Sequence, residues 1–283
     1  MTPTNDELAS KLAKRQVILF VGAGVSASLG LPSYAELIRQ LGEELDFDGQ
    51  IFEGLGDYLT LAEYYHLEKN GLQALQRHLQ KKWKKTRQEV AQAAVHRAIV
   101  ELGCDLIYTT NFDGFLEQAH RGMNKRYRAI RSAKSMVDLD EDAVHIVKLH
   151  GDLSSPKTMV FTETSYFERL SFESPLDLKL RADALGKSLL FIGYSLSDIN
   201  IRYLLFRLQR VWEREEKAEL RPKSYLFMTR PNPVQERVLK ERHVIPIVAE
   251  NTDPAASLAA FLKALRVRAN QLAVVHANSK QKK

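Results

Sequence analysis

Cysteine and long apolar runs are nearly absent from this sequence. Cys104 is the only cysteine in 283 residues, so the chain can form neither an internal disulfide nor a zinc site with four cysteine ligands. The longest apolar stretches, Val17–Val25 and Ser188–Ile192, are too short to cross a bilayer, and the amino terminus lacks the pattern of a signal peptide. We therefore expect a soluble, cytoplasmic, globular protein without membrane attachment.

A strong excess of charge is also missing. The formal net charge of +6 at pH 7 favours anionic partners but does not establish nucleic-acid binding. The basic excess is spread over the chain, apart from a lysine-rich end and one run: Lys81, Lys82, Lys84, Lys85 and Arg87. This run is either a solvated helix face or a patch that binds phosphate or a protein partner. Direct nucleic-acid binding therefore stays open.

Short apolar runs rich in β-branched residues recur along the chain, and each leads into a turn and a helical pattern. Six of them are predicted strands: Gln16–Val21, Asp105–Thr109, His145–Leu149, Ser188–Ile192, Lys223–Met228 and Val244–Val248. Helices are expected to begin near Ser33, Asp113, Ser197, Pro233 and Asp253. The alternation predicts an α/β fold with a doubly wound, parallel, Rossmann-like sheet.

Two stretches of helical composition interrupt this alternation. Residues 51–101 and 162–187 are predicted to be helical insertions that form a cap over the carboxyl edge of the sheet. We expect one domain over residues 1–275. Residues 276–283 are polar and basic without periodicity, which predicts a disordered tail.

The first predicted strand ends in a glycine-rich turn, Gly22-Ala23-Gly24-Val25-Ser26, which Gly30 and Pro32 follow. Glycines after a buried strand let backbone amides approach a diphosphate, and the amino terminus of the next helix adds a favourable dipole. A tight strand-to-helix turn without a ligand accounts for the pattern too. The turn favours a dinucleotide but does not require one.

Three further predicted strands end in polar clusters, TTNFD (residues 109–113), KLHGD (148–152) and GYSLSD (193–198). Carboxyl ends of parallel strands share one edge of a sheet, where polar groups are costly to bury unless they meet a ligand or one another. Each cluster also has a structural interpretation, because Asp113 or Ser197 can cap a helix and a lone histidine is often structural. Four such strand ends together indicate a ligand site.

The ordered set GAGVS, GLPSY, TTNFD, KLHGD and GYSLSD resembles the sirtuin family, and within it the zinc-less sirtuin-like effectors of bacterial anti-phage defence. The resemblance spans roughly residues 17–198. It implies catalytic roles for Asn111, which would position a water, for Asp113, which would fix the nicotinamide or its ribose, and for His150. His150 would act as a general base, with a pKa expected near neutrality.

The same resemblance implies a set of residues that contact NAD: Gly22, Ala23, Gly24, Ser26, Pro32, Tyr34, Thr110, Gly193, Tyr194, Ser195 and Asp198. Residues 229–232, after the fifth predicted strand, are candidates for the adenine pocket.

Sequence differences from the deacylating sirtuins indicate which branch of the family this chain resembles. Their zinc ribbon needs four cysteines, and no other metal site is indicated because His145 and His150 face opposite ways on one predicted strand. Their Pro-Asp-Phe-Arg is replaced by PSYA at residues 32–35, and Thr110 and Phe112 stand where they usually have Gln and Ile. These differences favour the defence-associated group.

The resemblance thus implies an NAD+ glycohydrolase that cleaves NAD to nicotinamide and ADP-ribose and depletes it during anti-phage defence. The alternatives are an NAD-dependent protein deacylase and a non-catalytic sensor of NAD or ADP-ribose. It also implies a homo-oligomer and a DNA-translocase ATPase of the HerA type as a partner. The chain itself lacks the G-x-x-x-x-G-K-S/T phosphate loop of such ATPases.

Overall fold

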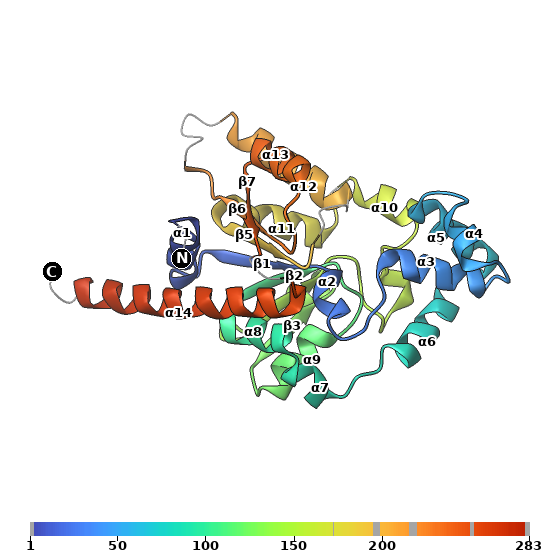
Figure 1. Cartoon of the computed structure of the whole chain (residues 1–283), viewed down its shortest axis with the longest axis horizontal. Helices are drawn as coiled ribbons and strands as arrows, with labels where there is room; N and C mark the ends of the chain where they lie inside the picture. The colour runs from blue at the N-terminus through green and yellow to red at the C-terminus, as the bar shows by residue number, and fades with distance from the viewer. Residues whose placement is uncertain (1–2, 172, 195–198, 215–219, 250–251, 281–283) are drawn as a thin grey trace.

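A parallel sheet forms the centre of the molecule in the computed structural model, which describes residues 3–171, 173–194, 199–214, 220–249 and 252–280 (Figure 1). Its seven strands are β1 (Val17–Val21), β2 (Leu106–Thr109), β3 (Tyr127–Ile130), β4 (Val144–Lys148), β5 (Ser188–Ile192), β6 (Ser224–Met228) and β7 (Val244–Val248). They lie in the order β3-β4-β2-β1-β5-β6-β7, and every neighbouring pair is parallel. The predicted α/β fold is confirmed.

All six predicted strands are present, with ends within one residue of the prediction. Every residue of β1, β5 and β6 is buried, which explains why these strands are continuous apolar runs in the sequence. Sequence analysis missed β3. It lies at the edge of the sheet with Arg128 exposed and only Ile130 fully buried, so it lacks the apolar run of a central strand.

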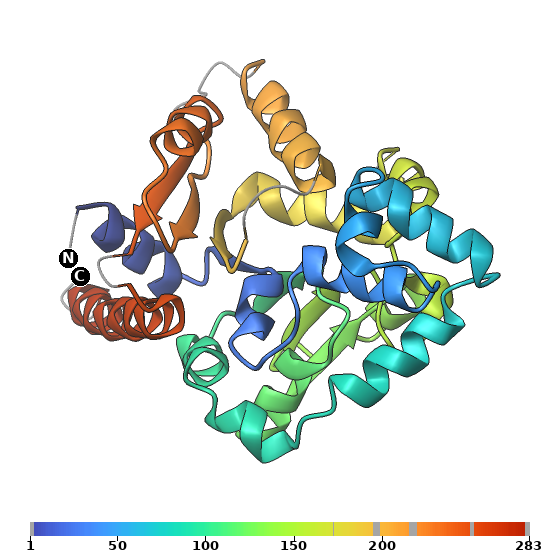
Figure 2. The same cartoon turned by 45° about the vertical axis from the view of Figure 1, so that its right-hand side comes forward.

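Helices cover both faces of the sheet (Figures 1 and 2). One face is covered by α1 (Pro3–Ala13), α8 (Ala94–Leu102), α9 (Phe115–Gly122) and α14 (Pro254–Lys280). The opposite face is covered by α11 (Pro175–Gly186), α12 (Ile199–Trp212) and α13 (Pro233–Glu241). The remaining short elements, apart from the helices of the next paragraph, are α2 (Ala23–Ala27), α7 (Arg87–Gln92), α10 (Glu163–Arg169), η1 (Ala133–Met136) and η2 (Pro156–Thr158).

Four helices form a separate lobe, here called the helical module: α3 (Tyr34–Glu43), α4 (Gly49–Glu53), α5 (Tyr58–Glu68) and α6 (Gln73–Lys82). Its own core includes Leu37, Phe52, Leu61 and Leu75, and Phe161 joins it from the segment after β4. The module begins before the predicted insertion at residue 51 and ends before residue 101. Helix α8 packs on the sheet instead, a distinction that helical periodicity cannot reveal.

The second predicted insertion, residues 162–187, is likewise shared between the helical module and the sheet. The backbone N–H of Thr164 in α10 donates to Glu63 of the helical module, whereas Leu180 of α11 packs on the sheet. At the carboxyl end, α14 continues to Lys280, so the expectation of disorder is wrong for residues 276–280. Adding residues to an existing helix is favourable, and α14 is already anchored to the sheet through Leu262 and Leu265. None of the described helices combines the length and apolarity needed to span a bilayer.

Candidate functional site

A cavity of about 1290 Å³ lies at the carboxyl edge of the sheet and reaches from the helical module to the start of α14. It opens where β1 lies between β2 and β5. After β1 the chain places β2, β3 and β4 on one side of β1, then returns to the other side of β1 with β5. Such a reversal leaves a crevice at the carboxyl ends of the strands, the usual ligand position in open α/β sheets.

Eleven residues that the sequence assigned to the site line this one cavity: Ala23, Gly24, Ser26, Pro32, Tyr34, Thr110, Asn111, Asp113, His150, Gly193 and Tyr194. The segments after β1, β2, β4 and β5 therefore meet, as predicted. Gly22 lies just behind this lining. Ser195 and Asp198 lie outside the described residues.

Glycines hold the turns after β1 and β5 against each other. A Cβ atom on Gly22 would lie 2.2 Å from Cδ2 of Tyr194, and one on Gly193 would lie 2.6 Å from the backbone N of Val25. The Gly24 N–H donates to the carbonyl of Gly193 at 3.0 Å. Gly193 also has a φ of +61°, which favours glycine. In this structure these glycines allow close packing of the two loops, and helix α2 begins directly at their junction.

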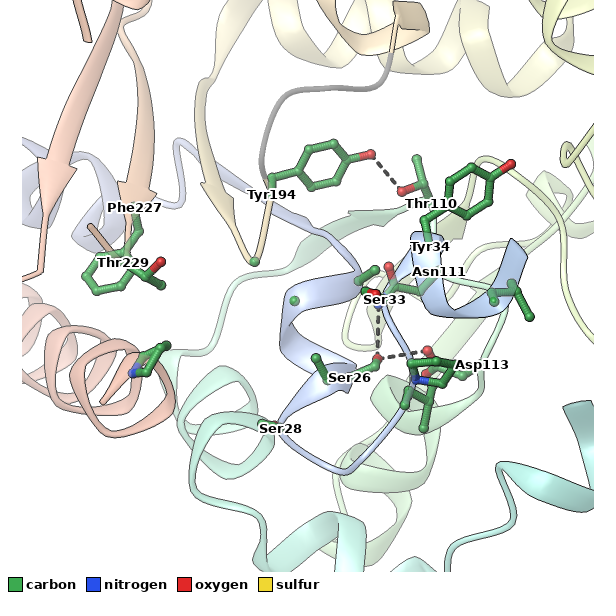
Figure 3. Close-up of a pocket in the computed structure, with 18 of the residues that line it drawn as sticks. Ser26, Ser28, Ser33, Tyr34, Thr110, Asn111, Asp113, Tyr194, Phe227 and Thr229 are labelled. Atoms are coloured by element: carbon green, nitrogen blue, oxygen red, sulfur yellow. Dashed lines mark hydrogen bonds between the residues drawn. The ribbon is translucent and has the colours of Figure 1, made fainter. Parts of the chain in front are cut away.

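A buried hydrogen-bond network joins Asn111, Ser26 and Asp113 (Figure 3). The Asn111 side-chain amide donates to Ser26 Oγ at 3.1 Å and to the Gly22 carbonyl at 3.2 Å. Ser26 Oγ in turn donates to Asp113 Oδ2 at 2.8 Å, and Asp113 Oδ1 accepts from the backbone N–H of Phe115 at 3.0 Å. Both N–H groups of Asn111 are thus used, while its buried Oδ1 has no hydrogen-bond partner among the described residues.

Two threonines tie the end of β2 to its neighbours. Thr109 Oγ1 donates to the Val21 carbonyl at 2.8 Å and accepts from the Asn111 backbone N–H at 3.0 Å, which fixes where Asn111 leaves the strand. Thr110 Oγ1 and the Tyr194 hydroxyl lie 2.6 Å apart, so a hydrogen bond connects the loops after β2 and β5 across the end of β1 (Figure 3). The Tyr194 ring packs edge-on against Phe20.

His150 lies in the cavity wall and is almost completely buried, with its ring 5.3 Å from that of Tyr166. Burial, together with the positive charge of Arg169, lowers the pKa of His150 to about 3. The expectation of a pKa near neutrality is wrong for this reason, since a lone motif does not reveal desolvation. The imidazole is neutral at physiological pH and can accept a hydrogen bond.

Aromatic rings form the wall on the side of the helical module, and sequence analysis assigned only Tyr34 among them. The Tyr34 ring lies 5.7 Å from that of Phe161, and its hydroxyl donates to the Phe161 carbonyl at 3.2 Å. A capping box between Ser33 and Glu36 starts α3 and places Tyr34 there. The other aromatic residues of this wall are Tyr58, Trp83, Phe112 and Tyr166. No sequence pattern connected them, because they come from separate segments.

The opposite arm of the cavity lies beyond β6. Residues 229–232, the predicted adenine-pocket candidates, line it together with Phe227. Sequence analysis missed Arg202 of α12 and Asp253 before α14, which line the same arm. Asp253 was expected to cap α14, and its Oδ1 does accept from the Ala255 N–H at 2.9 Å. From the sequence, Asp253 could be predicted to cap a helix but not to line the cavity as well.

In the described ranges, no three His, Cys, Asp or Glu side chains converge to hold a metal ion. The cavity offers hydrogen-bond acceptors, the carboxyl groups of Asp57, Asp113 and Asp253, and the neutral imidazole of His150 around a large concave space. These groups can bind hydroxyl groups and stabilise positive charge on a bound ligand.

Comparison with known proteins identifies relatives of similar sequence. The chain is 28% identical over 214 residues to the NAD(+) hydrolase ThsA of Acinetobacter baumannii (strain 532279), covering 75% of this chain and 43% of that protein. It is 29% identical over 216 residues to the NAD(+) hydrolase ThsA of Bacillus cereus (strain MSX-D12), covering 75% and 44%. Defense-associated sirtuin 2 of Bacillus subtilis is 25% identical over 242 residues, covering 82% and 23%. The chain thus spans less than half the length of these relatives.

A family model described as SIR2-like domain matches residues 105–247, just over half of the chain. The matched segment contains TTNFD, KLHGD and GYSLSD, and the glycine turn precedes it. Together with the parallel sheet and the motifs gathered at its edge, this match establishes the family. The chain belongs to the SIR2-like domain family.

Proposed function

We propose that this chain is an NAD+ glycohydrolase that releases nicotinamide and leaves ADP-ribose. The observation that carries the proposal is the unpartnered Oδ1 of Asn111 in the network with Ser26 and Asp113 at the switch-point cavity. A buried acceptor without a partner favours a ligand that donates a hydrogen bond, as a ribose hydroxyl or a water does. The relatives named NAD(+) hydrolase support the same substrate.

The chemistry makes modest demands on the protein. Nicotinamide leaves as a neutral base because its ring nitrogen is positively charged in NAD, so the leaving group needs no general acid. Cleavage passes through a state with positive charge on the ribose, as in other glycosyl transfers. The protein must therefore orient the ribose and stabilise positive charge.

We assign these tasks to three residues. Asp113, held by Ser26 and by the N–H of Phe115, presents a fixed carboxyl group toward developing positive charge. Asn111 Oδ1 accepts a hydrogen bond from a ribose hydroxyl or from the attacking water. The neutral imidazole of His150 accepts a second hydrogen bond, and its low pKa makes it a weak base. A weak base suffices where bond cleavage runs ahead of attack.

The proposal also includes a biological role in anti-phage defence and partners for the chain. A role in defence is supported by the name of the Bacillus subtilis relative, and NAD depletion against phage is supported by the resemblance of the motifs. Assembly into a homo-oligomer and association with a DNA-translocase ATPase are supported by that resemblance alone.

The test measures nicotinamide released from NAD by the purified chain, with and without an acetylated peptide. We expect release without the peptide, and a drop of about 100- to 10,000-fold for Asn111→Ala and His150→Ala. His145→Ala is the matched control, because His145 lies in β4, shortly before His150, and its ring lies outside the cavity lining and contacts the Asp140 carbonyl. Release only with the peptide would identify a deacylase, and NAD binding without release would identify a sensor.

A further inference from the structure

Lys148, the last residue of β4, carries a cation that is completely buried beneath the loop after β2. Its side chain lies on the face of the sheet covered by α9, where Nζ donates to the backbone carbonyl of Asp113. Nζ also lies 3.3 Å from Asp152 Oδ2 and 3.6 Å from Glu117 Oε1. An ammonium group at such depth is tolerated only where partners replace its water.

These partners form a balanced network of two cations and two acids. Arg131, which follows β3, contacts Asp152 at 3.1 Å and Glu117 at 3.4 Å. Burial opposes ionisation of Asp152, but Lys148 and its other partners outweigh that effect and lower its pKa to about 2. The network therefore connects the carboxyl ends of β2, β3 and β4.

Lys148 differs from Arg131 in what it touches. Of the two cations, Lys148 contacts Asp113 directly: its Nζ donates to the backbone carbonyl of Asp113, whereas Ser26 bonds to the side-chain carboxyl group. The Leu153 N–H donates to the Phe112 carbonyl at 3.1 Å, so the loops after β2 and β4 are also joined through their backbones. A shift of the Asp113 backbone would move its carboxyl group, then Ser26, then the amide of Asn111.

We propose that Lys148 is a positioning residue, which holds Asp113 and through it the Ser26–Asn111 network in the geometry that the nicotinamide end of the dinucleotide requires. This role rests on the proposed NAD cleavage. Lys148 is not among the residues that line the cavity. Its removal should therefore affect the nicotinamide end selectively and leave the adenosine end of the cavity intact.

Three variants separate positioning from fold maintenance. Lys148→Met removes the cation and its hydrogen bond to Asp113. The double variant Lys148→Met/Glu117→Gln removes one charge of each sign, so Arg131 and Asp152 remain balanced. Arg131→Met is the matched control, because it takes a cation from the same two acids without touching Asp113.

Each variant is compared with wild type in thermal stability, in kcat and KM for nicotinamide release, and in affinity for two probes by calorimetry. The probes are ADP, which lacks the nicotinamide ribose, and carba-NAD, whose nicotinamide bond is not cleaved because a carbon replaces the ribose ring oxygen. We expect both Lys148 variants to lose about 100-fold in kcat, since a small misplacement of orienting groups has this effect. We also expect about tenfold weaker carba-NAD binding with unchanged ADP binding, and Arg131→Met near wild type in both.

Asp113→Asn provides a further check. If Lys148 acts through Asp113, adding Lys148→Met to Asp113→Asn changes kcat by less than about threefold. The proposal is overturned if the charge-balanced double variant keeps the wild-type kcat and carba-NAD affinity, or if Arg131→Met loses as much as Lys148→Met. Should Lys148→Met fail to fold, the double variant decides.

Failure of the proposed function has a different signature. A wild-type chain that releases no nicotinamide overturns the hydrolase proposal, and the ratio of carba-NAD to ADP affinity then decides the role of Lys148 by itself. A wild-type chain that binds neither probe overturns both.

Discussion

Ser26→Ala removes one buried hydroxyl from the centre of the proposed site. Ser26 is 2% exposed, accepts from the Asn111 amide at 3.1 Å and donates to Asp113 at 2.8 Å. Alanine keeps the backbone and the Cβ atom, so helix α2 and the glycine turn are preserved. The change therefore isolates the hydrogen-bond network from the loop that carries it.

The size of the effect follows from the two lost contacts. A hydrogen bond to a charged group contributes about 1.5–3 kcal/mol, and an unpaired buried donor costs about 1–3 kcal/mol. Asn111 keeps its second N–H bond to the Gly22 carbonyl, which limits the loss. We expect the free energy of unfolding to fall by about 2 kcal/mol. If the transition state loses the same amount, kcat/KM falls by about 30-fold, since 1.36 kcal/mol corresponds to a factor of ten.

The assay combines urea unfolding with nicotinamide release from NAD. Ser28→Ala is the control, because Ser28 lies at the end of the same helix and, among the described residues, its hydroxyl bonds only to the nearby Val25 carbonyl, at 2.7 Å. We expect Ser28→Ala to remain within about threefold of wild type, as is usual for a local side-chain hydrogen bond. Equal activity of the two variants would refute the idea that Ser26 connects Asn111 to Asp113.

Two further predictions concern histidines. Because the pKa of His150 is lowered to about 3, kcat should show no step from this group between about pH 5 and about pH 8; a step near pH 6.5 that His150→Asn abolishes would contradict this. His96 is fully buried, both its ring nitrogens lack a partner among the described residues, and burial lowers its pKa to about 4. The unfolded chain then binds more protons than the folded one below about pH 6.5, so the stability present above that pH is lost as pH falls toward the two lowered pKa values. His96→Leu should raise the free energy of unfolding by about 1–3 kcal/mol at pH 7 and reduce this acid loss, and a less stable variant in urea unfolding would show that the ring has a partner.

The sequence predicted the sheet well because burial on both faces leaves a clear mark. Strands such as β1 and β5 are apolar at nearly every position, and the turn residues after them stand out. The site followed from the same logic, since parallel strands bring their carboxyl ends to one edge. Asn111, Asp113 and His150 could therefore be placed in one cavity before the structure was known.

Other features depend on contacts that no local pattern contains. The edge strand β3 exposes Arg128 and so lacks an apolar run. Helices α6 and α8 have similar periodicity, yet α6 packs within the helical module and α8 on the sheet. The pKa of His150 depends on burial and on Arg169, nineteen residues away in the chain. The role proposed for Lys148 rests on its complete burial and its contact with Asp113, neither of which the sequence indicates.

A structure of the Asn111→Ala variant with NAD bound tests the central claim most directly. The account predicts the diphosphate beside the Ala23–Gly24 turn, the nicotinamide ribose between residue 111 and His150, and the adenosine in the arm beyond β6. A dinucleotide bound elsewhere, or one lying in the cavity with its nicotinamide far from Asp113 and His150, would contradict it.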